Sequence, residues 1–62
     1  MRYFIIDNLN GNRTLQSFRS KRDCRSWLMD GLYGTDGAER DHYVSMLSQL
    51  DMGKMVLEYN AQ

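Results

Sequence analysis

The hydrophobic positions of this chain begin with a continuous apolar run at residues 3–6, Tyr-Phe-Ile-Ile. Such β-rich residues on both alternating faces are typical of a strand that is covered on both sides. The pattern therefore predicts a first strand that lies in the middle of a sheet.

An Asn-Gly pair after this run predicts a β-hairpin. Asn10 and Gly11 both accept the positive φ of a type I′ turn, and this dipeptide is the strongest short hairpin signal. With these two residues as the loop, a second strand covers residues 13–18, and Ile6 lies opposite Leu15.

A first amphipathic helix is predicted after the hairpin. Ser20, with Asp23 three residues later, forms a variant of the capping box, in which the serine accepts from the backbone of the aspartate. One apolar face then recurs at helical spacing, and it comprises Cys24, Trp27, Leu28, Gly31 and Leu32. Gly34 is expected to cap the end of the helix. Gly31 would let a second helix approach closely, at a cost of about 1 kcal/mol in helix propensity.

A second amphipathic helix is predicted over residues 37–52. Asp36 and Glu39 form another capping box at its start, and Gly53 stops it. Its apolar face comprises Tyr43, Met46, Leu47 and Leu50. The connection between the helices is short and polar, which makes them antiparallel neighbours.

Residues 54–59 alternate, with Met55, Leu57 and Tyr59 on one face, and this predicts a third strand with one buried side. The element order is therefore β-β-α-α-β. The expected fold is α+β: an N-terminal hairpin and a C-terminal strand form a three-stranded sheet, with a helical hairpin packed on one face. A central first strand would place the third strand beside it in parallel orientation, whereas a simple meander is the alternative.

Size and composition fit a single domain over residues 1–62. Of the 62 residues, 42% are hydrophobic and 26% are charged, as in a soluble globular domain. The single cysteine excludes an internal disulfide and fits a reducing compartment. The N-terminal apolar run is too short for a signal peptide or a transmembrane span, so a cytoplasmic protein without a membrane partner is expected.

Residues suited to catalysis or metal binding are sparse. Cys24 and His42 are the single cysteine and the single histidine of the sequence. Cys24 lies on the apolar face of the first helix, where a small buried thiol is expected, and His42 lies at the edge of the second helix's buried face. Closed metal sites need about four ligands, which no spacing in the sequence supplies. We therefore expect a non-catalytic protein without a metal or a cofactor.

Charge is distributed unevenly, although the net charge is zero. Residues 1–25 carry six basic and two acidic residues, whereas residues 26–62 carry two basic and six acidic ones, so the segments carry +4 and −4. The predicted basic face lies on the hairpin and the first helix, and it comprises Arg13, Arg19, Lys21, Arg22 and Arg25. Cations at a helix start oppose the helix dipole, so we interpret this face as a binding surface for anionic groups.

A predicted acidic corner surrounds the connection between the two helices, and it comprises Asp30, Asp36, Glu39 and Asp41. Acids in a first helical turn stabilise a helix by about 0.3–1 kcal/mol each, which accounts for two of the four residues without any function. The corner as a whole could contact a basic, nucleic-acid-binding surface of another protein.

Three kinds of partner fit these charges. The first is a larger protein, because segregated charges steer association and Arg and Tyr are favoured interface residues. The alternative is nucleic acid, bound by the basic face with aromatic strand residues as a stacking platform. Zero net charge and the lack of a nucleic-acid-binding motif disfavour that alternative. A homodimer formed through an exposed edge strand is a third option that the sequence leaves open.

Two segments carry a family resemblance: residues 34–43, GTDGAERDHY, and residues 50–54, LDMGK. In these segments, about a quarter of the chain, and in its order of elements, the protein resembles the small, uncharacterised early proteins of tailed bacteriophages. The resemblance implies a host-takeover or anti-defence role in which a host enzyme is blocked. The implied targets are a defence nuclease or CRISPR-type effector (an anti-CRISPR role), a recombination nuclease, or RNA polymerase. It transfers no site residues to this chain.

Overall fold

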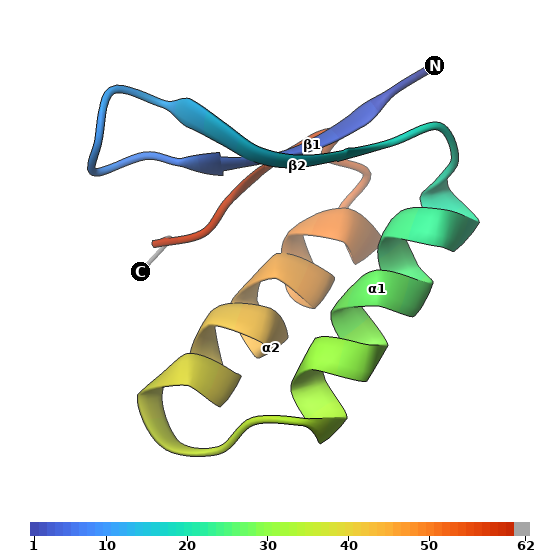
Figure 1. Cartoon of the computed structure of the whole chain (residues 1–62). Coiled ribbons are helices and arrows are strands. Elements are labelled where there is room, and N and C mark those ends of the chain that lie inside the picture. The colour runs from blue at the N-terminus through green and yellow to red at the C-terminus, as the bar shows by residue number, and fades with distance from the viewer. Residues whose placement is uncertain (61–62) are drawn as a thin grey trace.

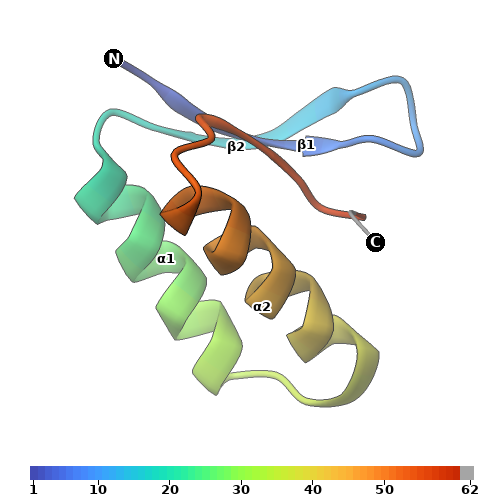
Figure 2. The same cartoon turned by 180° about the vertical axis from the view of Figure 1, so that it is seen from behind.

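A computed structural model gives the fold and describes residues 1–60. The elements follow the order β1 (Tyr3–Asp7), β2 (Arg13–Phe18), α1 (Lys21–Tyr33), α2 (Gly37–Asp51) and β3 (Val56–Glu58). The two helices form an antiparallel hairpin that packs on one face of the three-stranded sheet (Figure 1, Figure 2). The predicted α+β fold and its element order are confirmed.

The central strand of the sheet is β1. The strand order is β2-β1-β3, with β2 antiparallel and β3 parallel to β1. Of the two orders that the sequence allowed, the structure has the one with a crossover and not the meander. A parallel pair needs a long connection between its strands, and the helical hairpin supplies it.

The β-hairpin differs from the predicted two-residue turn. Pairing of β1 with β2 starts in the expected register, but it shifts after Ile5, and Ile6 lies opposite Thr14 instead of Leu15. Leu15 is 41% exposed. The predicted register is therefore wrong at the loop end of the hairpin.

The side chain of Asp7 accounts for this shift. Its carboxylate accepts from the side-chain nitrogen of Asn10 at 2.7 Å, and its carbonyl accepts from the Asn10 N–H at 3.2 Å. These bonds start the turn at Asp7, because an aspartate can close a local turn with its own side chain. The connection therefore spans residues 8–12. Positive φ angles fall on Gly11 and Asn12, at 70° and 58°, and not on Asn10.

The hydrophobic core forms where the sheet meets both helices. It consists of six fully buried side chains: Ile5, Cys24, Leu28, Met46, Leu50 and Leu57. All six occupy positions that the apolar periodicities predicted. Burial of an aliphatic side chain of this size is worth about 1.5–3 kcal/mol, so this small group of contacts holds the two layers together.

Helix α1 begins and ends as predicted. Ser20 Oγ accepts from the Asp23 N–H at 3.1 Å, and Gly34 is the C-cap residue. Gly31 lies against the ring of Tyr43, which a Cβ at Gly31 would overlap. The missing side chain therefore lets α1 and α2 approach closely, which confirms the role predicted for this glycine.

The capping box predicted at the start of α2 is wrong. Asp36 occupies the N-cap position, but its side chain accepts no capping hydrogen bond within residues 1–60. Gly37 takes a φ of 63°, which turns the backbone at the helix start, and the Asp36 carbonyl accepts from the Arg40 N–H at 3.4 Å. At the other end, Met52 is the C-cap residue and Gly53 follows with a φ of 90°.

A buried polar side chain on α2 was not predicted. Gln49 is 6% exposed, and its amide binds both backbone groups of Glu58 in β3. Gln49 Oε1 accepts from the Glu58 N–H at 2.8 Å, and Nε2 donates to the Glu58 carbonyl at 2.9 Å. This side chain takes the place of a neighbouring strand along the outer edge of β3.

Candidate functional site

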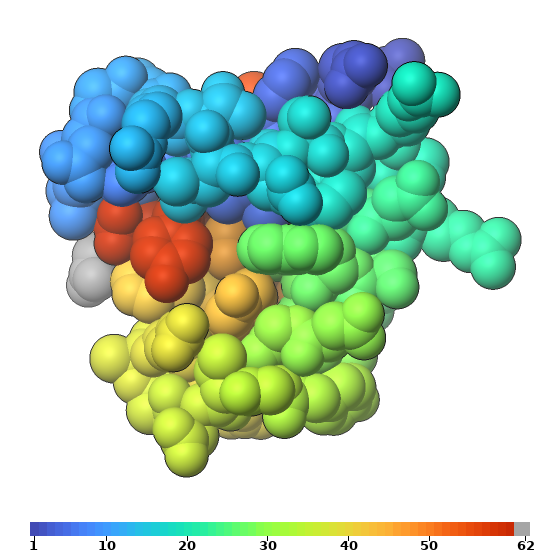
Figure 3. All heavy atoms as spheres, viewed as in Figure 1, coloured from blue at the N-terminus to red at the C-terminus, as the bar shows by residue number. Residues whose placement is uncertain are grey.

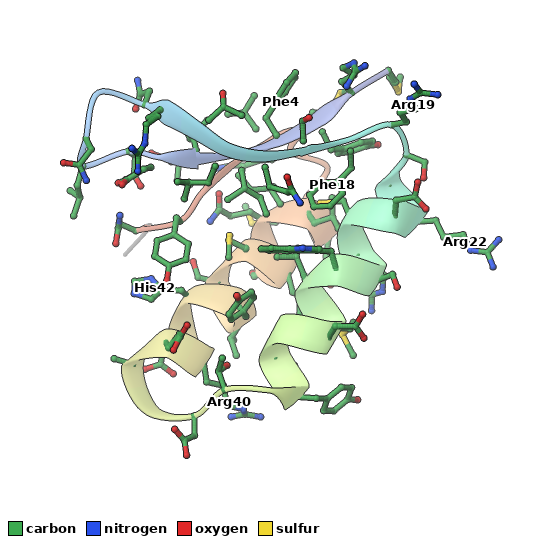
Figure 4. All side chains as sticks on the ribbon, in the orientation of Figure 1. Phe4, Phe18, Arg19, Arg22, Arg40 and His42 are labelled. Atoms are coloured by element: carbon green, nitrogen blue, oxygen red, sulfur yellow. The ribbon has the colours of Figure 1, made fainter. Side chains whose placement is uncertain are left out.

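Three of the five predicted basic residues lie together at one end of the sheet. Arg19 follows β2, Lys21 and Arg22 open α1, and all three are exposed. Arg2 directly precedes β1, whose first residue pairs with the last residue of β2, so it leaves the sheet at the same end. Figure 4 shows Arg19 and Arg22 pointing away from the body of the molecule. We call these four residues the basic end.

The other two predicted basic residues differ from the basic end: Arg13 is distant from it, and Arg25, one helical turn from Lys21 and Arg22, is paired with an acid. Arg13 is exposed at the opposite end of β2, about 20 Å from Arg19 at the usual rise of a strand. Arg25 Nη1 lies 2.9 Å from Asp51 Oδ1, with side chains that are 50% and 61% exposed. This exposed ion pair stabilises the fold by less than about 1 kcal/mol, but it offsets the charge of Arg25. The structure therefore divides the predicted basic face.

The four predicted acidic residues surround the connection between α1 and α2, at the end of the helical hairpin that lies far from the sheet. They are Asp30, Asp36, Glu39 and Asp41, and all are exposed. Arg40 lies between Glu39 and Asp41 in α2, so the five charges around the connection sum to −3. The four residues of the predicted acidic corner are thus exposed near the connection between the two helices, and their role in binding stays a prediction.

The charge asymmetry along the sequence is also an asymmetry in space. Helix α1 has 13 residues, which is a length of about 20 Å. It starts at the basic end and finishes beside the acidic corner, so these two surfaces lie at opposite ends of the helical hairpin (Figure 1). Separated charges of opposite sign orient a protein in the field of its partner before contact.

A row of aromatic side chains runs from β2 across α1 to α2. The ring centroids of Phe18 and Trp27 are 5.7 Å apart, and those of Trp27 and Tyr43 are 5.9 Å apart. Trp27 was predicted to lie on a buried helix face, but it is 38% exposed. An indole is too large to be covered fully by so small a core. We call these three residues the aromatic row.

Cys24 and His42 are both engaged in packing. Cys24 is fully buried, and burial raises the pKa of its thiol, which disfavours the thiolate. His42 Nδ1 donates to the Tyr59 carbonyl at 2.7 Å, and the two rings stack with centroids 4.2 Å apart. Burial, and then nearby acidic groups led by Glu39, raise the pKa of the Tyr59 hydroxyl. The contacts of His42 with Tyr59 fix the segment after β3 against α2. That the chain is non-catalytic stays a prediction.

Within residues 1–60, no group of three or more His, Cys, Asp or Glu side chains is arranged to hold a metal ion. The same part of the chain encloses no pocket, and it contains no helix that is long and apolar enough to cross a bilayer. Comparisons with models of known protein families, with curated proteins and with solved structures found no match to this chain.

Proposed function

We propose that this chain is a non-catalytic, cytoplasmic protein-binding module that inhibits or modulates a larger host enzyme. The observation that carries the proposal is the separation of an exposed basic end from an exposed acidic corner, with a partly exposed Trp27 between them. Arg and Trp are the residue types that most often dominate interface energies. A standard interface of about 800 Å² per partner would cover roughly a fifth of the 4263 Å² surface.

The basic end is better explained by binding than by stability. Lys21 and Arg22 occupy the first turn of α1, where the positive end of the helix dipole opposes each cation by about 0.3–1 kcal/mol. Asp23, in the same turn, offsets part of this cost. Solubility alone would be served as well by Glu or Gln, which favour the helix start. The arginines and the lysine are therefore expected to meet anionic groups of a partner.

Two ways of docking follow from the charge separation. Either the basic end docks on an acidic patch of the partner, or the acidic corner enters a channel that normally binds nucleic acid. Such channels are lined with Lys and Arg, which suits a corner with a summed charge of −3. The resemblance to phage early proteins supports a defence nuclease or CRISPR-type effector, a recombination nuclease or RNA polymerase as the host enzyme.

Nucleic-acid binding is a second candidate function, because four cations lie together at the basic end: Arg2, Arg19, Lys21 and Arg22. A protein that neutralises four phosphates loses affinity steeply with salt. The logarithm of its binding constant falls with the logarithm of the salt concentration, with a slope of about −3 to −4. This salt dependence is the signature by which the second candidate is recognised.

Capture of a partner tests the proposed function. The tagged protein is immobilised and incubated with lysate of a bacterial host. We expect a stoichiometric partner that is lost in one of two charge-reversal variants, Arg19→Glu/Arg22→Glu at the basic end or Glu39→Lys/Asp41→Lys at the acidic corner. Ser48→Lys is the control, since it adds a charge at an exposed position of α2 outside both surfaces and should leave capture intact in either way of docking.

Electrophoretic shifts with single- and double-stranded oligonucleotides separate the two candidate functions. At moderate salt we expect no shift. Salt-sensitive micromolar binding that is lost in Arg19→Glu/Arg22→Glu would instead support the nucleic-acid function. Failure of the wild-type protein to capture any stoichiometric partner would count against the proposed protein-binding function.

A further inference from the structure

The two edge strands of the sheet, β3 and β2, differ in the partners of their outward-facing backbone groups. At the β3 edge, the Gln49 side chain already binds the backbone N–H and carbonyl of Glu58. At the other edge, β2 pairs with β1 and, within residues 1–60, with no further strand. Five of the six residues of β2 are exposed. An open edge of this kind is a template to which another chain can add a strand.

Backbone groups in β2 point toward this open edge. Phe4 donates its N–H to the Met55 carbonyl at 2.9 Å, so the backbone of Phe4 faces β3 and not β2. In an antiparallel pair, two opposite residues either exchange both hydrogen bonds or exchange none. Ser17 lies opposite Phe4, and it therefore turns its N–H and its carbonyl away from β1. A fourth strand can bind these two groups.

The charge along β2 favours an acidic partner. Arg13 and Arg19 stand at the two ends of this segment, and no acidic residue lies between them. A second copy of β2, paired antiparallel about Gln16, would set Arg13 against Arg19, and like charges directly opposite each other are destabilising. Asp7 of β1 lies opposite Arg13 and offsets part of its charge, so an acidic strand would be attracted chiefly at the Arg19 end, and it fits this edge better than a second copy of the chain.

The aromatic row lies beside the same edge. Phe18 is the last residue of β2, and its ring centroid lies 5.7 Å from that of Trp27. Figure 3 shows β2 (cyan) directly above α1 (green) on the face that is turned to the viewer. Alternate side chains of an added strand would face the helices. Apolar side chains at these positions would cover the exposed part of Trp27.

We propose that the open edge of β2 binds an extended acidic segment of the partner protein as a fourth strand of the sheet. The backbone of this segment bonds to Ser17, its carboxylates lie near Arg13 and Arg19, and its alternate apolar side chains cover Trp27. The inference rests on the proposed protein-binding function and specifies the chemistry of the partner. That partner is a protein with an exposed segment in which acidic and apolar residues alternate.

A designed peptide tests this inference without the natural partner. The probe is a fluorescein-labelled peptide in which glutamate alternates with valine and tyrosine, and the control peptide has lysine at each glutamate position. Fluorescence anisotropy at low salt should show saturable binding of the acidic peptide, at least about tenfold tighter than that of the lysine peptide. Hydrogen exchange followed by NMR should show slower exchange of the Ser17 N–H in the complex.

The variant Ser17→Pro separates strand addition from charge attraction alone. Proline removes the N–H that faces the open edge, and edge strands tolerate proline where the N–H faces solvent. The variant should bind the acidic peptide about tenfold or more weakly, whereas the matched control Ser17→Val keeps the N–H and should bind like wild type. Circular dichroism and urea unfolding establish the fold of both variants. If the proline variant does not fold, protection of the wild-type Ser17 N–H decides the test.

Three results would overturn the inference: no binding of the acidic peptide, equal binding of both peptides, or unchanged binding by a folded Ser17→Pro variant. None of them affects the capture experiment, which detects a partner at any surface. Conversely, peptide binding at Ser17 without a captured partner contradicts the proposed function and leaves the β2 edge as a strand-binding site.

Discussion

Gln49 shows how one side chain can complete a sheet. Its amide offers one acceptor and one donor, like the backbone of a neighbouring strand, and it satisfies Glu58 at 2.8 and 2.9 Å. The hydrophobic pattern could not reveal this role, because a glutamine counts as a polar position on an amphipathic helix. The available signal was its place three residues after Met46 and next to Leu50, within the buried stripe.

We expect Gln49→Ala to lower the free energy of unfolding by about 1–3 kcal/mol, because the N–H and carbonyl of Glu58 lose their partner. Urea unfolding followed by circular dichroism measures the change. Ser48→Ala, at the exposed neighbouring position, is the control and should alter stability by less than about 0.5 kcal/mol. Similar losses in the two variants would contradict the bridging role of Gln49.

Hydrophobic periodicity and turn signals located all five elements, because both helices and β3 bury one recognisable face, β1 is a continuous apolar run and β2 follows the Asn-Gly pair. The hairpin register and the exposure of Trp27 are among the local features that escaped these signals. The hairpin register depends on the Asp7 carboxylate, whose bond to Asn10 starts the turn earlier than the Asn-Gly signal indicates. The exposure of Trp27 depends on how much apolar volume the core has to cover its ring. The helical spacing of apolar residues gives no information on that volume.

Reversing charge at the start of α1 is expected to stabilise the helix. Lys21→Glu/Arg22→Glu should raise the free energy of unfolding by about 0.6–2 kcal/mol per residue at low salt, since each change removes an unfavourable cation and adds a favourable acid at the helix start. The gain should shrink as salt screens the charges. Urea unfolding at low and high salt provides the measurement, and the neutral variant Lys21→Gln/Arg22→Gln should give an intermediate gain. A double-Glu variant that is less stable than wild type would show that these cations serve the fold.

Over the complete molecule, the helical hairpin determines which charges meet. The four residues of the acidic corner lie near one end of the molecule because the end of α1 and the start of α2 are adjacent along the chain. The basic residues are split because β2 and α1 extend in different directions. Arg13 lies at the far end of β2, and Arg25 is turned toward Asp51. No sequence period could have shown this division.

Cys24 is expected to report on the unfolding of the entire chain. It is fully buried in the core, and burial raises the pKa of its thiol, so a thiol reagent reacts only after the core opens. The extent of labelling at increasing urea should follow the unfolding curve measured by circular dichroism. Leu15→Cys in a Cys24→Ala background provides an exposed thiol that should react at once. Rapid labelling of Cys24 in native protein would indicate an opening short of unfolding.

The closure of the β3 edge by Gln49 also decides what kind of assembly strand addition could produce. A filament needs molecules that each give and receive a strand at opposite edges, and here the Gln49 amide already occupies the outward-facing backbone groups of Glu58 at one edge. A further strand can therefore be added to each copy at the β2 edge only. Complexes formed at β2 would then have a fixed stoichiometry, and the protein would not polymerise through strand addition even at high concentration.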